Sequence, residues 1–372
     1  MRILLVNDLA ISDPERSGAE VYLDRLAGAL SRAGHEIDLF AGEVRHAGAG
    51  RVLDLWDPRA RSRLVSRVQA TRPDVVHFHN VVRELSVAAL LVPAPRVLTA
   101  HDMRLAGTVD PRTGSIRGII DRQLKRRLDA TVARRALDEV VAVSEPVAES
   151  LRAAGFLRVT TMSPPAPIPI RSPRSPDDCS DLAYAGRLSQ DKGIFVLLQA
   201  WRLISERHPT SRLLVAGDGP LRDDLSQVGD ESVHFVGRLD SDGVSRLLGS
   251  VRAVVVPSLP RLRPEGSPLS VVDAAAHGRP VIASDDPGIA ALAAVLPGCV
   301  LSPAGDVRAL AAHLDQLLNE PAHAARLGKA NAEASRLEHA PEHLAARMEQ
   351  VYQRAIEARR PRVRTREVAY SG

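Results

Sequence analysis

The sequence lacks the features that mark several common classes of protein. Its two cysteines, Cys179 and Cys299, show neither the density of a disulfide scaffold nor the spacing of a metal site. No apolar run approaches the ~18 residues that span a membrane, and the N-terminus lacks the long apolar stretch of a signal peptide. We therefore expect a cytoplasmic protein whose only contact with a membrane would be peripheral.

Lysine is also scarce, since only Lys125, Lys192 and Lys329 occur among 49 basic residues. The formal net charge is +4, too small a basic excess for a dedicated nucleic-acid binder, so no nucleic-acid partner is expected. Hydrophobic residues make up 45% of the chain and charged residues 25%, the balance of a globular protein. A chain of 372 residues predicts two domains, because domains usually hold ~100–200 residues.

Short β-branched runs alternate with amphipathic stretches, which predicts β-α-β units, parallel sheets and the α/β fold class. In the first half, strands are expected at residues 3–6, 37–40, 75–78, 97–100 and 140–143, with a helix over about 20–33. In the second half, strands are expected at residues 182–185, 212–216, 233–236, 251–256 and 280–283.

Proline divides the two halves. Residues 163–179 hold six prolines, too many for a helix or a central strand. The sequence therefore predicts a first domain over 1–165, a linker over 166–179 and a second domain over 180–340. A last helix over 341–360 is expected to pack back toward the first domain, ahead of a tail at 361–372.

A specific pattern occupies residues 264–284, PEGSPLSVVDAAAHGRPVIAS. It resembles the donor-site signature of the GT-B glycosyltransferases of family 4, in which two glutamates eight residues apart frame a helix start. The resemblance places Glu265 at the transferred sugar and Asp273, one methylene shorter than the family's Glu, at the ribose. An ordinary helix start is the alternative interpretation.

The helix start itself suits a sugar nucleotide, because its amides point at anionic oxygens while carboxylates accept hydrogen bonds from sugar hydroxyls. Pro268 stands where the family usually has Gly, and it brings no N–H. The neighbouring amides of Ser267, Leu269 and Ser270 are therefore expected to anchor the donor.

A second pattern, GRLSQDKG at residues 186–193, directly follows an expected strand and also resembles the family. The resemblance implies that Arg187 and Lys192 neutralise the charge of the donor diphosphate and that Gly186 lies at the donor. Cations aimed at a leaving diphosphate lower the barrier as its charge grows. The alternative is a turn in solvent.

Three further turns follow the family's order. Gly217, in AGDGP, and Leu239, in VGRL, both follow strands, and the resemblance implies that backbone near Leu239 reads the nucleobase. Gly18, in SGAE, opens the first helix and resembles the family's glycine loop at the diphosphate or acceptor. Tight turns need glycine in any α/β protein, so a purely structural role is the alternative.

Histidines mark the first half. His101 ends a strand and resembles the family histidine that contacts the transferred sugar from the opposite domain. His77 and His79 lie two residues apart on one strand and so share a face. A metal site formed by these two with His101 and Asp102 is therefore an alternative interpretation. Buried or cleft-lining histidines are the simpler interpretation, and no metal is predicted.

Residues 117–137 are expected to form a helix whose apolar residues recur at a spacing of four among arginines and lysines. These apolar residues are Ile120, Leu124, Leu128 and Val132. A charged face in solvent is the simpler interpretation. Peripheral contact with anionic lipid at the inner face of a membrane is the alternative, as is contact with an acidic acceptor.

The resemblance implies two Rossmann-like domains facing each other across a cleft and transfer of a sugar to an acceptor hydroxyl with retention of configuration. It implies no cofactor beyond the nucleotide-sugar donor. The acceptor would be a sugar, a lipid-linked saccharide or a small molecule. Two alternatives stay open, a GT-B epimerase or hydrolase of sugar nucleotides and an inactive nucleotide-sugar-binding subunit.

Overall fold

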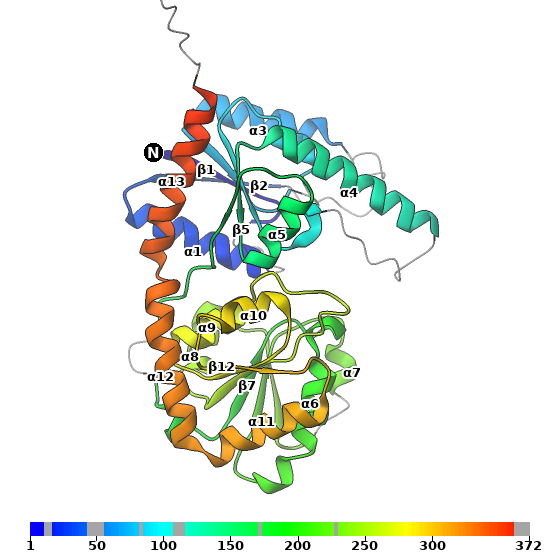
Figure 1. Cartoon of the computed structure of the whole chain (residues 1–372), viewed down its shortest axis with the longest axis vertical. Helices are drawn as coiled ribbons and strands as arrows, with labels where there is room; N and C mark the ends of the chain where they lie inside the picture. The colour runs from blue at the N-terminus through cyan, green and yellow to red at the C-terminus, as the bar shows by residue number, and fades with distance from the viewer. Residues whose placement is uncertain are drawn as a thin grey trace, which may run out of the picture.

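The computed structural model describes residues 1–10, 17–42, 56–81, 85–106, 116–169, 173–226 and 230–360, with side chains except at 116–124 and 226. Two parallel six-stranded sheets, each covered by helices, form the molecule (Figure 1). This confirms the α/β fold class. The expected tail at 361–372 lies outside the described residues.

The first sheet has the strand order β2-β1-β3-β4-β5-β6. Its strands are β1 (Arg2–Asn7), β2 (Glu36–Ala41), β3 (Val75–Phe78), β4 (Arg96–Ala100), β5 (Glu139–Ala142) and β6 (Val159–Thr161). Its helices are α1 (Gly18–Arg32), α3 (Pro58–Thr71), α4 (Ile116–Ala136) and α5 (Glu145–Ala153), with short 3-10 turns η1 (Val87–Leu90) and η2 (Met103–Ala106).

The second sheet has the order β12-β11-β10-β7-β8-β9. Its strands are β7 (Leu182–Ala185), β8 (Leu213–Ala216), β9 (Val233–Gly237), β10 (Ala253–Val256), β11 (Val281–Ser284) and β12 (Cys299–Ser302). The helices are α6 (Ile194–Arg202), α7 (Arg222–Ser226), α8 (Ser241–Leu248), α9 (Leu269–Ala276), α10 (Pro287–Ala293), α11 (Val307–Asn319) and α12 (Pro321–Glu338). Short 3-10 turns are η3 (Pro176–Asp178), η4 (Gln190–Lys192) and η5 (Ser205–Arg207).

Each sheet has a point where the chain reverses the direction in which it adds strands. That point lies between β1 and β3 in the first sheet and between β7 and β10 in the second. Open parallel sheets bind ligands outside the carboxyl ends of their strands at such a point. The fold alone therefore directs attention to the loops that follow β7 and β10.

The last helix, α13 (Pro341–Arg359), belongs to the core of the first sheet although it follows the second sheet in the chain. Its buried face consists of Leu344, Ala345, Met348, Val351, Tyr352 and Ala355. Figure 1 shows α12 beside the second sheet and α13 beside the first, along the same side of the molecule. The chain therefore crosses between the two sheets twice.

Candidate functional site

Lys192 and Glu265 meet at the reversal point of the second sheet. The Lys192 Nζ lies 2.5 Å from Oε1 of Glu265, and the Ser258 hydroxyl donates to the same oxygen at 2.5 Å. Lys192 follows β7 and Ser258 follows β10, so neighbouring strands deliver both partners. The ammonium and the hydroxyl together fix the direction of the Glu265 carboxylate.

Gly193 explains how the loop after β7 reaches this position. Its backbone is left-handed, with φ of +68°, and a Cβ there would lie 1.8 Å from the Pro257 carbonyl oxygen. Only glycine permits both the conformation and this close approach. Lys192, the preceding residue, is thereby held against the end of β10.

The loop that carries Glu265 is fixed from α10. The Glu265 N–H donates to Oδ2 of Asp286 at 3.0 Å, and Asp286 also caps α10 by accepting from the Gly288 N–H at 2.8 Å. Asp286 is fully buried, and burial raises the pKa of its carboxyl group. Asp286 lies outside the patterns singled out from the sequence, although an Asp before Pro287 is a recognisable helix-start signal.

Other residues expected at the donor site lie in the neighbouring turns of the second domain. The Arg187 side chain is exposed, and its carbonyl accepts from the Tyr184 hydroxyl at 2.6 Å. A Cβ on Gly217 would lie 1.8 Å from the Gly186 carbonyl oxygen, so the turns after β7 and β8 touch. Leu239 is half-buried in the loop that follows β9.

The start of helix α9 lies beside the Lys192–Glu265 pair. Leu269 and Ser270 are its first two residues, and Pro268 is its N-cap, which extends the chain ahead of the helix. Ser270 lines a cavity of about 40 Å³ together with Gly186, Lys192 and Glu265. This volume accommodates a water molecule and is far below the ~300–1,000 Å³ of ligand pockets.

Residues of the two domains are in direct contact across this region. A Cβ on Gly266 would lie 2.1 Å from the His101 carbonyl oxygen, so the loop after β4 rests on the loop that carries Glu265. A Cβ on Gly18 would lie 3.7 Å from Leu269. Arg263 reaches Asp102 at 3.2 Å. The predicted residues of both domains therefore meet at one interface.

His101 is half-buried and lies beside two buried histidines, His77 and His79. Its Nε2 lies 3.1 Å from Nδ1 of His79, while His77 bonds the Tyr352 hydroxyl and Thr99 Oγ1, each at 2.8 Å. Burial lowers the pKa of His101 to about 4 and that of His77 to about 3. All three rings are therefore neutral near pH 7. Among the described residues, no group of three or more His, Cys, Asp or Glu side chains could hold a metal ion.

Asp273 takes part in a contact that sequence analysis did not foresee. Its two oxygens accept from Nη1 and Nη2 of Arg25 at 2.6 and 2.9 Å. Arg25 lies on α1 of the first domain, so the carboxylate expected at the ribose faces the opposite domain in this structure. No local pattern around Arg25 indicates this partner.

Helix α4 contains the basic stretch. Leu128 is 39% exposed, whereas Val132 packs against the first core, and Lys125 pairs with Asp129 at 2.9 Å. The side chains of Ile120 and Leu124 lie outside the described residues. No helix within the described ranges is long and apolar enough to cross a membrane.

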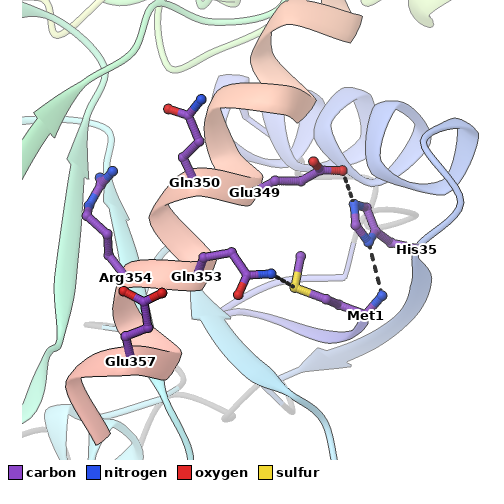
Figure 2. Close-up of a pocket in the computed structure, with 7 residues that line it drawn as sticks. All are labelled: Met1, His35, Glu349, Gln350, Gln353, Arg354 and Glu357. Atoms are coloured by element: carbon purple, nitrogen blue, oxygen red, sulfur yellow. Dashed lines mark hydrogen bonds and ion pairs between the residues drawn. The ribbon is translucent and has the colours of Figure 1, made fainter. Parts of the chain in front are cut away.

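A larger hollow, of about 550 Å³, lies elsewhere (Figure 2). Met1 and His35, at the amino ends of β1 and β2, line it with Glu349, Gln353 and Arg354 of α13. The His35 ring joins the N-terminal amine at 3.2 Å to Glu349 at 2.6 Å. Because it opens at the amino ends of the strands, it is remote from the residues described above.

Comparisons with known proteins match both halves of the chain. Residues 16–165 match the model of "Glycosyltransferase Family 4", and residues 179–320 match that of "Glycosyl transferases group 1". Glycogen synthase of Mycobacterium tuberculosis is 29% identical over 276 residues, which cover 70% of this chain and 63% of that protein. The match thus spans less than two thirds of that relative.

Solved structures agree over nearly the full length. Sucrose-phosphate synthase of Thermosynechococcus elongatus superposes with a TM-score of 0.75 at 22% identity, covering 96% of this chain and 99% of that one. Anabaena HepE, in complex with UDP and glucose, gives 0.68 at 17% identity over 95% and 99%. These superpositions show that the chain shares the GT-B fold of two Rossmann-like domains. With a family model matched to each domain, the chain belongs to the group 1, family 4 glycosyltransferases of the GT-B fold.

Proposed function

We propose that this protein transfers a sugar from a nucleotide-sugar donor to an acceptor hydroxyl with retention of anomeric configuration and without a bound metal. The observation that carries the proposal is the Lys192–Glu265 pair at the reversal point of the second sheet, in contact through Gly266 with His101 of the first domain. The second domain, 180–340, would bind the donor. The first domain, 1–165, would bind the acceptor.

The chemistry follows from the charges at this site. Cleavage of the bond from the anomeric carbon to the donor diphosphate leaves negative charge on the diphosphate, which Lys192 and Arg187 would stabilise. The acceptor oxygen then bonds to the anomeric carbon on the same face, and its proton passes to the departing diphosphate oxygen. Glu265 and His101 would hold the sugar as positive charge develops on it, while the backbone of Gly18, Gly186 and Gly217 would approach the donor.

The start of α9 would hold the anionic part of the donor. The amides of Ser267, Leu269 and Ser270 lie at a helix N-terminus, where the backbone favours negative charge. A diphosphate there would compete with Glu265 for the Lys192 ammonium, since both are anions within reach of one cation. Donor binding would therefore release the Lys192–Glu265 pair.

UDP-glucose is the first donor to test, because structural relatives were solved with UDP, glucose and UDP-glucose. Leu239 would lie near the base and Asp273 near the ribose. The acceptor would be a sugar, a lipid-linked saccharide or a small molecule. Because the basic residues of helix α4 suit an anionic acceptor or an anionic lipid surface, anionic acceptors are the first to test.

The test is release of nucleoside diphosphate from a panel of uridine, guanosine and adenosine diphosphate sugars, with and without pooled acceptors and in excess chelator. Release that requires an acceptor, persists in chelator and gives a product with the donor's anomeric configuration supports the proposal. Equal release without acceptor would identify a hydrolase instead. Donor binding without turnover for any acceptor would indicate an inactive binding subunit.

A further inference from the structure

His79 is a buried residue that the proposed mechanism does not use. Its side chain is 3% exposed at the end of β3. Its Nδ1 lies 3.1 Å from Nε2 of His101, and the two ring planes are inclined by only 29°. Its other nitrogen, Nε2, is buried and has no hydrogen-bond partner among the described residues.

The neighbouring rings leave His79 no other partner. Both nitrogens of His77 are occupied, one by Tyr352 and the other by Thr99. Tyr22 meets His101 edge to face, with ring centroids 4.9 Å apart, and so restrains the plane of the His101 ring. The geometry around the His79–His101 contact is therefore fixed from several sides.

The His79–His101 contact must contain a single proton. Burial lowers the pKa of both residues, so both rings are neutral and each carries one N–H. In one arrangement His79 donates from Nδ1 to a bare Nε2 of His101. In the other, His101 donates from Nε2, and the proton of His79 sits on its own Nε2.

The second arrangement is disfavoured by the surroundings of His79. It would place an N–H at the buried His79 Nε2, where no acceptor lies among the described residues. Buried N–H groups without an acceptor are rarer in proteins than acceptors without a donor. The first arrangement leaves only a bare nitrogen there, and it requires the His101 proton to be on Nδ1.

We propose that His79 is a positioning residue that holds His101 in the Nδ1–H tautomer, so that His101 offers a hydrogen-bond donor to the oxygens of the transferred sugar. The inference rests on the proposed function, in which His101 contacts that sugar. The hydrogen bond of the His101 ring to His79 runs through Nε2, and the residue as a whole is only half-buried. The His101 carbonyl lies against Gly266, next to Glu265, so the ring is close to the site.

The direct test uses full-length protein with nitrogen-15-labelled histidine. At pH 7, the ring nitrogens of His101, assigned by comparison with His101→Ala, should show a protonated Nδ1 and an unprotonated Nε2. The pattern for His79 should be the same. A protonated Nε2 on His101 overturns the inference, whatever the enzymatic activity.

A kinetic test separates positioning from packing. His79→Leu removes the donor and should lower kcat by at least tenfold with little change in the KM for donor, whereas His79→Gln, which keeps an amide N–H, should recover most of the loss. His77→Gln is the matched control, because His77 is equally buried but does not bond His101. Equal losses in His79→Leu and His79→Gln would overturn the positioning role.

The two proposals fail in different ways. If His101 shows the expected tautomer but His101→Ala retains full turnover, the role of His101 in the proposed function fails while the tautomer assignment stands. If His101→Ala is inactive but its parent carries the proton on Nε2, the proposed function stands and the role of His79 fails.

Discussion

Arg25 and Asp273 join the two domains by a bidentate ion pair, with N–O distances of 2.6 and 2.9 Å. Arg25 lies on α1 and Asp273 on α9. The same guanidinium donates to the Pro165 carbonyl oxygen at 3.2 Å, at the end of the first domain. One side chain thus contacts α9 of the second domain and the residue directly ahead of the proline-rich linker.

This relationship predicts a measurable coupling between the two residues. Both side chains are mostly buried, at 15% and 11% exposure, so removal of one leaves the other charge poorly solvated. Arg25→Ala and Asp273→Ala should each destabilise the protein by about 1–3 kcal/mol, and the double variant by clearly less than the sum. Denaturant unfolding measures all three. The Arg67–Asp38 pair, which is more exposed and lies within one domain, is the control and should show little coupling.

Nucleotide binding tests the expected role of Asp273 separately. A carboxylate that accepts two bonds from Arg25 keeps free lone pairs, so it can also bond a ribose hydroxyl. If it does, Asp273→Ala should weaken binding of free nucleoside diphosphate by about 10- to 100-fold, the equivalent of a lost hydrogen bond to a charged group. Asp273→Glu should bind at least as well as the parent. Equal affinity of the parent and Asp273→Ala in calorimetry would remove Asp273 from the ribose site.

Lys192 should be needed for turnover rather than for folding. Its side chain is 29% exposed and pairs with Glu265, which keeps a bond from Ser258 when Lys192 is removed. Lys192→Ala should lower kcat by about 100- to 1,000-fold, because a group that stabilises transition-state charge is lost. Thermal unfolding should shift little. Lys329→Ala, an exposed lysine in a weak helical pair, should match the parent in both assays, and an unaltered kcat for Lys192→Ala would contradict the mechanism.

The strands at the centre of each sheet could be predicted from sequence because they are continuous apolar runs, as parallel strands buried on both faces must be. The edge strands β6 (Val159–Thr161) and β12 (Cys299–Ser302) were not predicted. Each is three or four residues long and only partly buried, so the apolar signal is weak. Lys192 and Glu265 could be singled out from sequence because each lies in a pattern that resembles the family, at residues 186–193 and 264–284. Sequence analysis missed Arg25, whose partner is 248 residues away.

Helix α4 shows a different limit of sequence patterns. Four apolar residues, Ile120, Leu124, Leu128 and Val132, recur at a spacing of four along this helix. A spacing of four advances about 40° per step around a helix of 3.6 residues per turn, so the row drifts from one side to the other. Val132 packs on the core, whereas Leu128, four residues earlier, is 39% exposed.

Acid should destabilise the fold through its buried histidines. Burial lowers the pKa of His77 to about 3 and that of His101 to about 4, against about 6.5 in the unfolded chain. Between these values the unfolded chain binds protons that the folded protein does not, so stability is complete above about pH 6.5 and falls as the pH falls. By pH 5 each such histidine costs about 2 kcal/mol.

Comparison of variants isolates this effect from other titrating groups, since burial raises the pKa of Asp138 to about 7 and that group acts in the opposite direction. His77→Gln removes one proton-binding site from the unfolded chain, so its stability should fall by about 2 kcal/mol less than that of the parent between pH 7 and pH 5. His234→Gln is the control, because His234 is exposed on β9 and meets solvent in both states. Its pH dependence should equal that of the parent.

Denaturant unfolding at pH 7, 6 and 5 measures all three proteins. Equal slopes for His77→Gln and the parent would show that His77 takes up its proton as readily in the folded protein as in the unfolded chain, which contradicts a neutral ring held between Tyr352 and Thr99.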